Sequence, residues 1–100
     1  MNKFNVGDKV RILTKNELLE LPKMQVLNFT NDIYDSICKN YIVKGMYKYL
    51  GKIYTISKVI DADDISNGYY LSDCGFIWEE RWLTELTQAE LVLFTTPEQQ

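Results

Sequence analysis

A chain of 100 residues with 46% hydrophobic and 25% charged residues has the size and composition of one folded domain, and it contains no apolar run near the roughly 18 residues of a membrane span. Its net charge of −3 and its two arginines argue against non-specific binding of DNA or RNA, which needs a basic surface that releases counterions. The absence of histidine excludes histidine-activated nucleophiles and, because two cysteines cannot complete an all-cysteine site, the usual zinc centres.

The two cysteines, Cys38 and Cys74, lie in separate segments and form no Cys-x-x-Cys unit. Two buried thiols in a reducing cytoplasm are the expected arrangement, and a single disulfide stays open as the alternative. The N-terminal stretch MNKFNVGDKV lacks the apolar core of a signal peptide, so we expect a cytoplasmic protein.

The first strand is predicted at residues 9–12, where charged and apolar side chains alternate after a Gly-Asp turn. Thr14 and Glu17 have the spacing of a capping box, in which two residues bond each other's backbone N–H groups. They predict a short helix that ends before Pro22.

A second helix is predicted over residues 33–42, because apolar side chains recur there at intervals of four, as they do on one face of a helix. Thr30 or Asn31 is its expected N-cap. A single helical turn follows, and Gly51 is its expected terminator. We therefore expect the segment of about 14–50 to be a helical insertion.

Turn residues and alternating side chains dominate the second half of the chain and favour several short strands, as in a small barrel. From Thr87 a second capping-box pattern precedes the apolar run LVLF, so a short helix and a strand both stay open there, before a tail at about 95–100. The elements predicted before Thr87 are a strand at 53–60, a polar turn at 61–68, hairpin strands at 69–73 and 76–78, a helical turn at 79–83 and a strand at 84–86.

Three stretches of the chain read VGDKVRI, MYKYLGKIYTI and YYLSDCGFIWEERWLTEL. Together they resemble small, mostly uncharacterised SH3-like barrel proteins encoded by phages and prophages of low-GC Gram-positive bacteria. The resemblance covers about half the chain and departs between Leu13 and Tyr41, where this chain carries a longer insertion. The positions that match the pattern of the family are Gly7, Asp8, Val10, Met46, Gly51, Lys52, Thr55, Ile56, Trp78 and Leu83.

The resemblance implies a single α+β domain over residues 1–100: a small five-stranded SH3-like β-barrel with one or two helices inserted after the first strand. The function that it favours is a non-enzymatic protein-binding module of the host cytoplasm, for example a phage-encoded accessory protein or an inhibitor of a host defence complex. We expect no catalytic residues and no cofactor.

Aromatic side chains are the predicted contacts to a protein partner, because tyrosine and tryptophan are enriched in interfaces. The alternative interpretation is that these rings only cover the barrel, and one of the two tryptophans is expected in the core. The candidate protein-binding residues are Tyr54, Tyr69, Trp78, Glu79, Glu80 and Trp82.

A nucleic-acid-binding barrel is the alternative function, in which lysines and a tyrosine gather on one face and bases stack on the ring. Its candidate residues are Lys44, Tyr47, Lys48, Lys52 and Lys58, three of them spaced by four. A homodimer formed through an edge strand also stays open.

The run DADD at residues 61–64 is not expected to bind a metal. A calcium loop that began at Asp61 would need glycine at its sixth position and glutamate at its twelfth, where this chain has Ser66 and Ser72. We interpret the run as a solvated turn.

Overall fold

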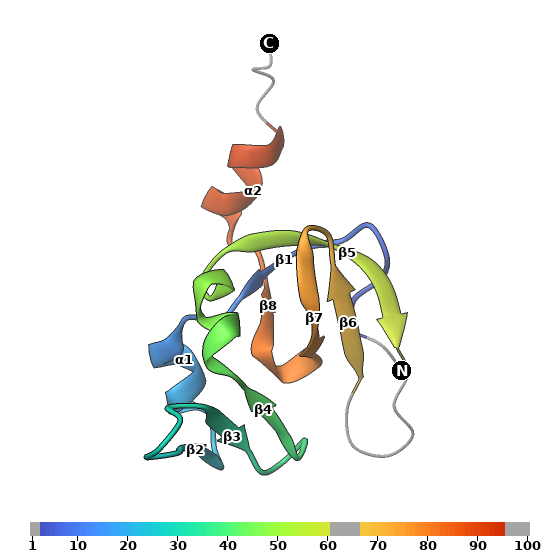
Figure 1. Ribbon diagram of the computed structural model, residues 1–100. Helices are drawn as coiled ribbons and strands as arrows, with labels where there is room; N and C mark the ends of the chain where they lie inside the picture. Colours follow the sequence, from blue (N-terminus) through green and yellow to red (C-terminus); the bar gives the residue numbers. More distant parts are fainter. Residues whose placement is uncertain (1–2, 61–66, 96–100) are drawn as a thin grey trace.

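The computed structural model describes residues 3–60 and 67–95, and their side chains up to residue 92. It has an α+β fold in which short antiparallel strands form two sheets and the helices are few (Figure 1), so the predicted α+β class is confirmed. In chain order the elements are β1 (Lys9–Ile12), α1 (Lys15–Glu20), β2 (Met24–Val26), β3 (Ile33–Asp35), β4 (Asn40–Ile42), the 3₁₀ helix η1 (Lys44–Tyr49), β5 (Ile53–Ile60), β6 (Gly68–Leu71), β7 (Cys74–Glu79), the 3₁₀ helix η2 (Glu80–Trp82), β8 (Leu83–Glu85) and α2 (Gln88–Thr95).

The larger sheet has the strand order β7-β6-β5-β1-β8, in which β1 pairs with both β5 and β8. The alternation predicted for residues 9–12 is confirmed, because Val10 and Ile12 are fully buried whereas Lys9 is exposed. The strand predicted at 53–60 is β5, and the predicted hairpin is formed by β6 and β7.

The insertion after β1 contains a second sheet, and the helix predicted over residues 33–42 is wrong. β2, β3 and β4 are antiparallel there, and a four-residue turn joins β3 to β4. Ile33 and Ile42 lie opposite each other in this hairpin, and both are fully buried. Of the apolar residues whose spacing suggested a helical face, Ile33 and Ile42 face the core from two strands, whereas Ile37 lies exposed in the turn and Tyr41 is exposed on β4. Lys39 closes the turn with a φ of 58°, and its N–H donates to the Asp35 carbonyl at 2.7 Å.

The two helical turns on either side of that sheet are confirmed. Before α1, the Thr14 hydroxyl accepts from the Glu17 N–H at 3.2 Å, and the Glu17 carboxylate accepts from the Thr14 N–H at 2.8 Å. α1 then ends before Pro22, as predicted. The turn before Gly51 is η1, and Gly51 follows it with a φ of 81°, a backbone conformation that favours glycine.

The two sheets share one core. Trp78 and Trp82 are fully buried in it, with their ring centroids 6.2 Å apart in an edge-to-face arrangement. Ile33 and Ile42 of the smaller sheet belong to the same buried cluster as Val10 of β1. The insertion is therefore part of the same folded unit and not an appendage.

A buried carboxylate joins the two sheets. Asp35 of β3 is fully buried, and its Oδ2 atom accepts hydrogen bonds from Trp82 Nε1 at 2.8 Å and from Arg81 Nε at 2.7 Å. We call these three residues the Asp35 bridge. A second bond across the sheets runs from Asn40 Nδ2 to Glu79 Oε2 at 2.9 Å. These three hydrogen bonds hold the β3–β4 hairpin against β7 and η2.

α2 stands away from the sheets (Figure 1). Of the helix and the strand that the sequence allowed after Thr87, the structure has the helix. In its predicted capping box the Glu90 carboxylate accepts from the Thr87 N–H at 2.7 Å, and the Thr87 hydroxyl accepts from the Glu90 N–H at 3.2 Å. Arg11 Nε lies 3.3 Å from Glu90 Oε2, which ties the first turn of α2 to β1. The predicted polar turn and the predicted tail fall largely on residues 61–66 and 96–100, outside the described residues.

Candidate protein-interaction surface

Three of the predicted partner contacts belong to the core. Tyr69, Trp78 and Trp82 are fully buried, so the prediction that they form an exposed binding surface is wrong. The physical reason is that each polar ring atom has a partner inside the fold. Trp78 Nε1 donates to Cys74 Sγ at 3.0 Å, the Tyr69 hydroxyl donates to Glu80 Oε1 at 2.6 Å, and Trp82 belongs to the Asp35 bridge.

The other three predicted contacts are Tyr54, Glu79 and Glu80. Glu79 is buried and bonded across the sheets. Burial acts to raise the pKa of Glu80, but hydrogen bonds from the Tyr69 hydroxyl and the Lys3 N–H outweigh it and hold that pKa below its ordinary value. Both acids therefore stabilise the fold. Tyr54 is half-buried, and its contact with a partner stays a prediction.

Only some of the lysines and the tyrosine predicted for a nucleic-acid-binding face lie together. The prediction of one face rests on a four-residue spacing, whereas η1 is a 3₁₀ helix with three residues per turn, so the spacing does not align the side chains. Lys15 of α1 joins the group on η1 instead, with its Nζ atom 5.1 Å from the centroid of the Tyr47 ring. Lys58 lies on β5, opposite Tyr70. The predicted members on or directly after η1 are Lys44, Tyr47, Lys48 and Lys52.

A groove between the two sheets is the strongest candidate for a binding site. It has a volume of about 490 Å³, and we call it the inter-sheet groove. β4 and η1 supply one half of its lining, and β6 and β7 supply the other half. The lining residues are Asn40, Tyr41, Val43, Met46, Tyr70, Gly75, Phe76 and Ile77.

Large apolar side chains lie exposed along this groove. Tyr41 is 46% exposed and Ile77 is 40% exposed. The Tyr41 ring lies 4.8 Å, centroid to centroid, from the ring of Tyr34, so the aromatic surface continues from the groove onto the smaller sheet. Tyr70, opposite Ile77 in the β6–β7 register, is half-buried. A partner's apolar side chains would find contact area here that the fold itself leaves uncovered.

None of the groove residues is among the contacts predicted from the sequence. The pattern places Tyr41 in a helix, and it gives Ile77 no role beyond a hairpin strand. The strand-forming composition of Tyr-Ile-Val at residues 41–43 is the signal that could have placed Tyr41 on a sheet surface. Nothing in the sequence brings Tyr41 and Ile77 together.

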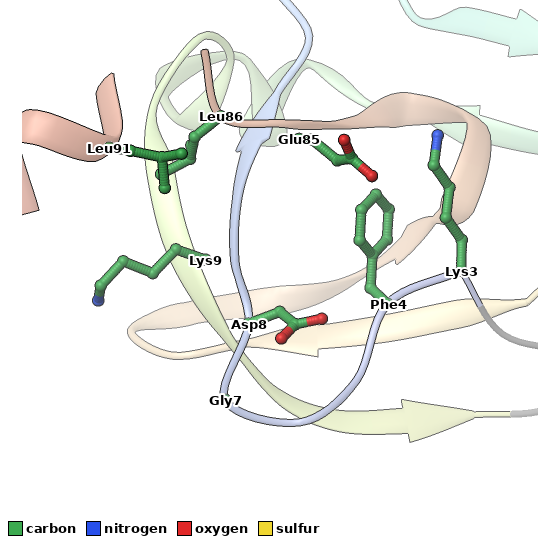
Figure 2. A pocket seen from close by; sticks show the side chains of 8 residues that line it. All are labelled: Lys3, Phe4, Gly7, Asp8, Lys9, Glu85, Leu86 and Leu91. Carbon is green, nitrogen blue, oxygen red and sulfur yellow. The ribbon is translucent and has the colours of Figure 1, made fainter. Parts of the chain in front are cut away.

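A second hollow, of about 500 Å³, lies at the base of α2 and is a weaker candidate. Figure 2 shows the Phe4 ring at one side of it, between Lys3, Asp8 and Glu85. Phe4 is only 3% exposed, and charges of both signs surround it. Charged residues of both signs line this hollow, whereas none of the described charged residues lines the inter-sheet groove.

Phe29, in the loop between β2 and β3, is fully exposed. Its loop is nevertheless tied to η1, because the Tyr47 hydroxyl donates to the Asn31 carbonyl and the Lys44 N–H donates to Asp32 Oδ1 at 3.0 Å. The loop thus presents an aromatic ring to solvent beside η1.

In residues 3–60 and 67–95, no three His, Cys, Asp or Glu side chains lie close enough to hold a metal ion, and no helix is long and apolar enough to cross a membrane. Cys38 and Cys74 are buried free thiols, so the prediction of two buried thiols is confirmed and the alternative of a disulfide is not. Burial, reinforced by the charges of Glu79 and Asp35, raises the pKa of Cys38 to about 12. A thiol that stays protonated at neutral pH is a poor nucleophile.

We expect neither cysteine to react with the thiol reagent 5,5′-dithiobis(2-nitrobenzoate) in the native protein, because the thiolate is the reactive form and both sulfurs are buried. The absorbance of the released thiolate, followed with and without denaturant, measures this. Both thiols should react promptly after unfolding. Stoichiometric labelling of the native protein within minutes would contradict the burial of the two thiols.

Comparison of the chain with known proteins finds no family model that matches it, no similar curated protein and no similar solved structure.

Proposed function

We propose that this protein is a non-enzymatic protein-binding module whose inter-sheet groove holds a segment of another protein. The observation that carries this proposal is the exposure of Tyr41 and Ile77 beside a groove lined by residues of both sheets. A tyrosine ring offers a large contact area with few rotatable bonds, which is why interfaces favour it.

An SH3-like barrel is the finer architecture that we propose for the larger sheet, and the connection between its edge strands supports it. In a flat sheet, β7 and β8 would lie four strand spacings, or about 19 Å, apart. The three residues of η2 join them, and the four steps from Glu79 to Leu83 reach at most about 14 Å when extended, or about 8 Å as a 3₁₀ turn. Such a connection requires the sheet to curl until its two edges approach.

The resemblance to phage-encoded barrel proteins supports a concrete version of this function. In it, the protein is a small accessory factor that occupies a surface of a bacterial protein, such as a component of a defence complex, in the host cytoplasm. The mechanism is steric, because the groove offers contact area and no reactive group.

The nucleic-acid alternative is less well supported, because both arginines are engaged inside the fold. Arg11 bonds Glu17 at 2.9 Å and contacts Glu90, and the bond to Arg11 is the main reason that the pKa of Glu17 falls to about 2. Arg81 bonds the buried Asp35. Neither guanidinium is available for the two-pronged phosphate or guanine contacts that arginine provides.

Affinity capture from a lysate of the host bacterium tests the function. Substitution of both Tyr41→Ala and Ile77→Ser is expected to weaken a captured partner's affinity by about 2 kcal/mol or more, roughly 30-fold, because it removes the exposed apolar contacts of the groove. The partner is identified by mass spectrometry, and its affinity is then measured with purified components.

Val6→Ser is the matched control, since Val6 is 62% exposed and lies outside the inter-sheet groove. The control should retain the partner and unfold at nearly the wild-type denaturant concentration, and the groove variant should stay folded in the absence of denaturant. A partner that binds the groove variant as tightly as the wild type would remove the groove from the proposed function.

A further inference from the structure

We infer that the segment held by the groove is acidic, an inference that rests on the protein-binding function proposed above. Three exposed lysines lie on η1, which lines the inter-sheet groove, or on β5, which pairs with the groove strand β6. Lys44 and Lys48 lie on η1, which also supplies Met46 to the groove lining. Lys58 lies on β5, directly opposite the lining residue Tyr70. We call Lys44, Lys48 and Lys58 the groove lysines.

The packing of η1 places two of these lysines close to the groove. A Cβ atom built on Gly45 would lie 3.8 Å from the Phe76 ring, so η1 approaches β7 at a position between Lys44 and Lys48. Met46 is buried there, whereas Lys44 and Lys48, two positions to either side of it, are exposed.

Carboxylates of the described chain do not neutralise the groove lysines. The ion pairs in residues 3–60 and 67–95 all use arginines, and the groove lysines are exposed. The closest partner of Lys48 is the ring of Tyr49, whose centroid lies 5.3 Å from Nζ. The groove thus has a positive rim in a chain whose net charge is −3.

Of the described acids near the groove, all but one form hydrogen bonds within the fold. Asp35 belongs to the Asp35 bridge, and Glu79 is buried and bonded to an amide. Asp32 accepts from the first backbone N–H of η1. Asp73, in the turn between β6 and β7, is the exposed exception, and its charge acts on Tyr54.

An acidic peptide matches this surface better than a nucleic acid does. Val43, Met46 and Ile77 line the groove beside its rings, and aliphatic side chains cannot stack on bases as aromatic ones do. A peptide that carries both carboxylates and apolar side chains would satisfy the lysine rim and the apolar lining together.

Three synthetic peptides test the inference. They share one pattern of leucine and phenylalanine residues and differ only in having glutamate, glutamine or lysine at the positions between. Fluorescence anisotropy with the full chain should show that the glutamate peptide binds about tenfold more tightly than the glutamine peptide, with the lysine peptide weakest. Raising the salt concentration should narrow these differences, because it screens the exposed charges. Oligothymidylate serves as a fourth probe.

The double variant Lys44→Glu, Lys58→Glu is expected to weaken the glutamate peptide about tenfold or more and to leave the glutamine peptide unchanged. Lys23→Glu reverses one lysine charge between α1 and β2, away from the groove lining, and should leave all affinities unchanged.

The outcomes separate this inference from the function on which it rests. Equal affinity for all three peptides overturns the acidic partner but leaves a groove that binds apolar segments. Tightest binding of oligothymidylate overturns it in favour of a nucleic-acid face, and failure of every peptide to bind overturns it as well. A failure of the proposed function itself appears as peptide binding that the Tyr41→Ala, Ile77→Ser variant leaves unaltered.

Discussion

Replacement of Asp35 by alanine is expected to lower the free energy of unfolding by about 3–5 kcal/mol, because it leaves the Arg81 guanidinium and the Trp82 N–H without their buried partner. The carboxylate also accepts from the Ile37 N–H at 3.0 Å, so the turn after β3 loses a bond too. Urea denaturation at neutral pH, followed by tryptophan fluorescence, measures the change.

Glu20→Ala is the control for this substitution, since Glu20 is an exposed carboxylate on α1 and its loss should cost about 0.5 kcal/mol or less. A loss below about 1 kcal/mol in the Asp35 variant would show that the bridge contributes little to the stability of the fold.

Because of the same bridge, the free energy of unfolding depends on pH in the acidic range. Burial acts to raise the pKa of Asp35, but the bonds from Trp82 and Arg81 outweigh it and hold that pKa below its ordinary value. The stabilisation is therefore complete above the unfolded-state pKa of about 3.9 and is lost as the pH falls through the lower native value. Asp35→Asn should flatten the decline of the unfolding free energy in this acidic range relative to the wild type.

Trp78→Ala is expected to cost about 3–5 kcal/mol, the usual range for removing a fully buried indole. Its ring packs edge-to-face on Trp82 and on Tyr49, at 6.2 and 6.3 Å between centroids, and its Nε1 atom bonds Cys74. The cavity would lie where the two sheets meet. Thermal and urea unfolding both measure the loss.

Tyr41→Ala is the matched control, because it removes an aromatic ring that is 46% exposed and should cost about 1 kcal/mol or less. Similar losses in the two variants would contradict the assignment of Trp78 to the core and Tyr41 to the surface.

Local signals in the sequence predict the elements whose stabilising contacts are themselves local. The Thr14–Glu17 capping box defines the start of α1 from four residues, and the alternation at 9–12 reads directly as β1. The β3–β4 hairpin has no such signal, because its turn ends in Lys39 at positive φ, where a glycine would have marked it. Its apolar residues also fit a helical period by coincidence.

The candidate site was less predictable because composition cannot separate a core ring from a surface ring. The buried Trp82 donates its indole N–H to the carboxylate of Asp35, which is 47 residues away in the sequence. No spacing rule indicates such a partner. Tyr41 and Ile77 meet only after two separate sheets have packed. Physical reasoning from the sequence anticipates aromatic rings in excess, and the tertiary structure decides which of them face solvent.

The Asp35 bridge has a consequence for recognition. It fixes the mutual orientation of the two sheets whose residues form the walls of the groove, so the cleft is preorganised in the free protein. A ligand that enters a preorganised cleft sacrifices less conformational entropy, and its affinity rises accordingly. Loosening the bridge should therefore slow productive docking and shorten the lifetime of a complex, although the bridge itself lies outside the groove lining.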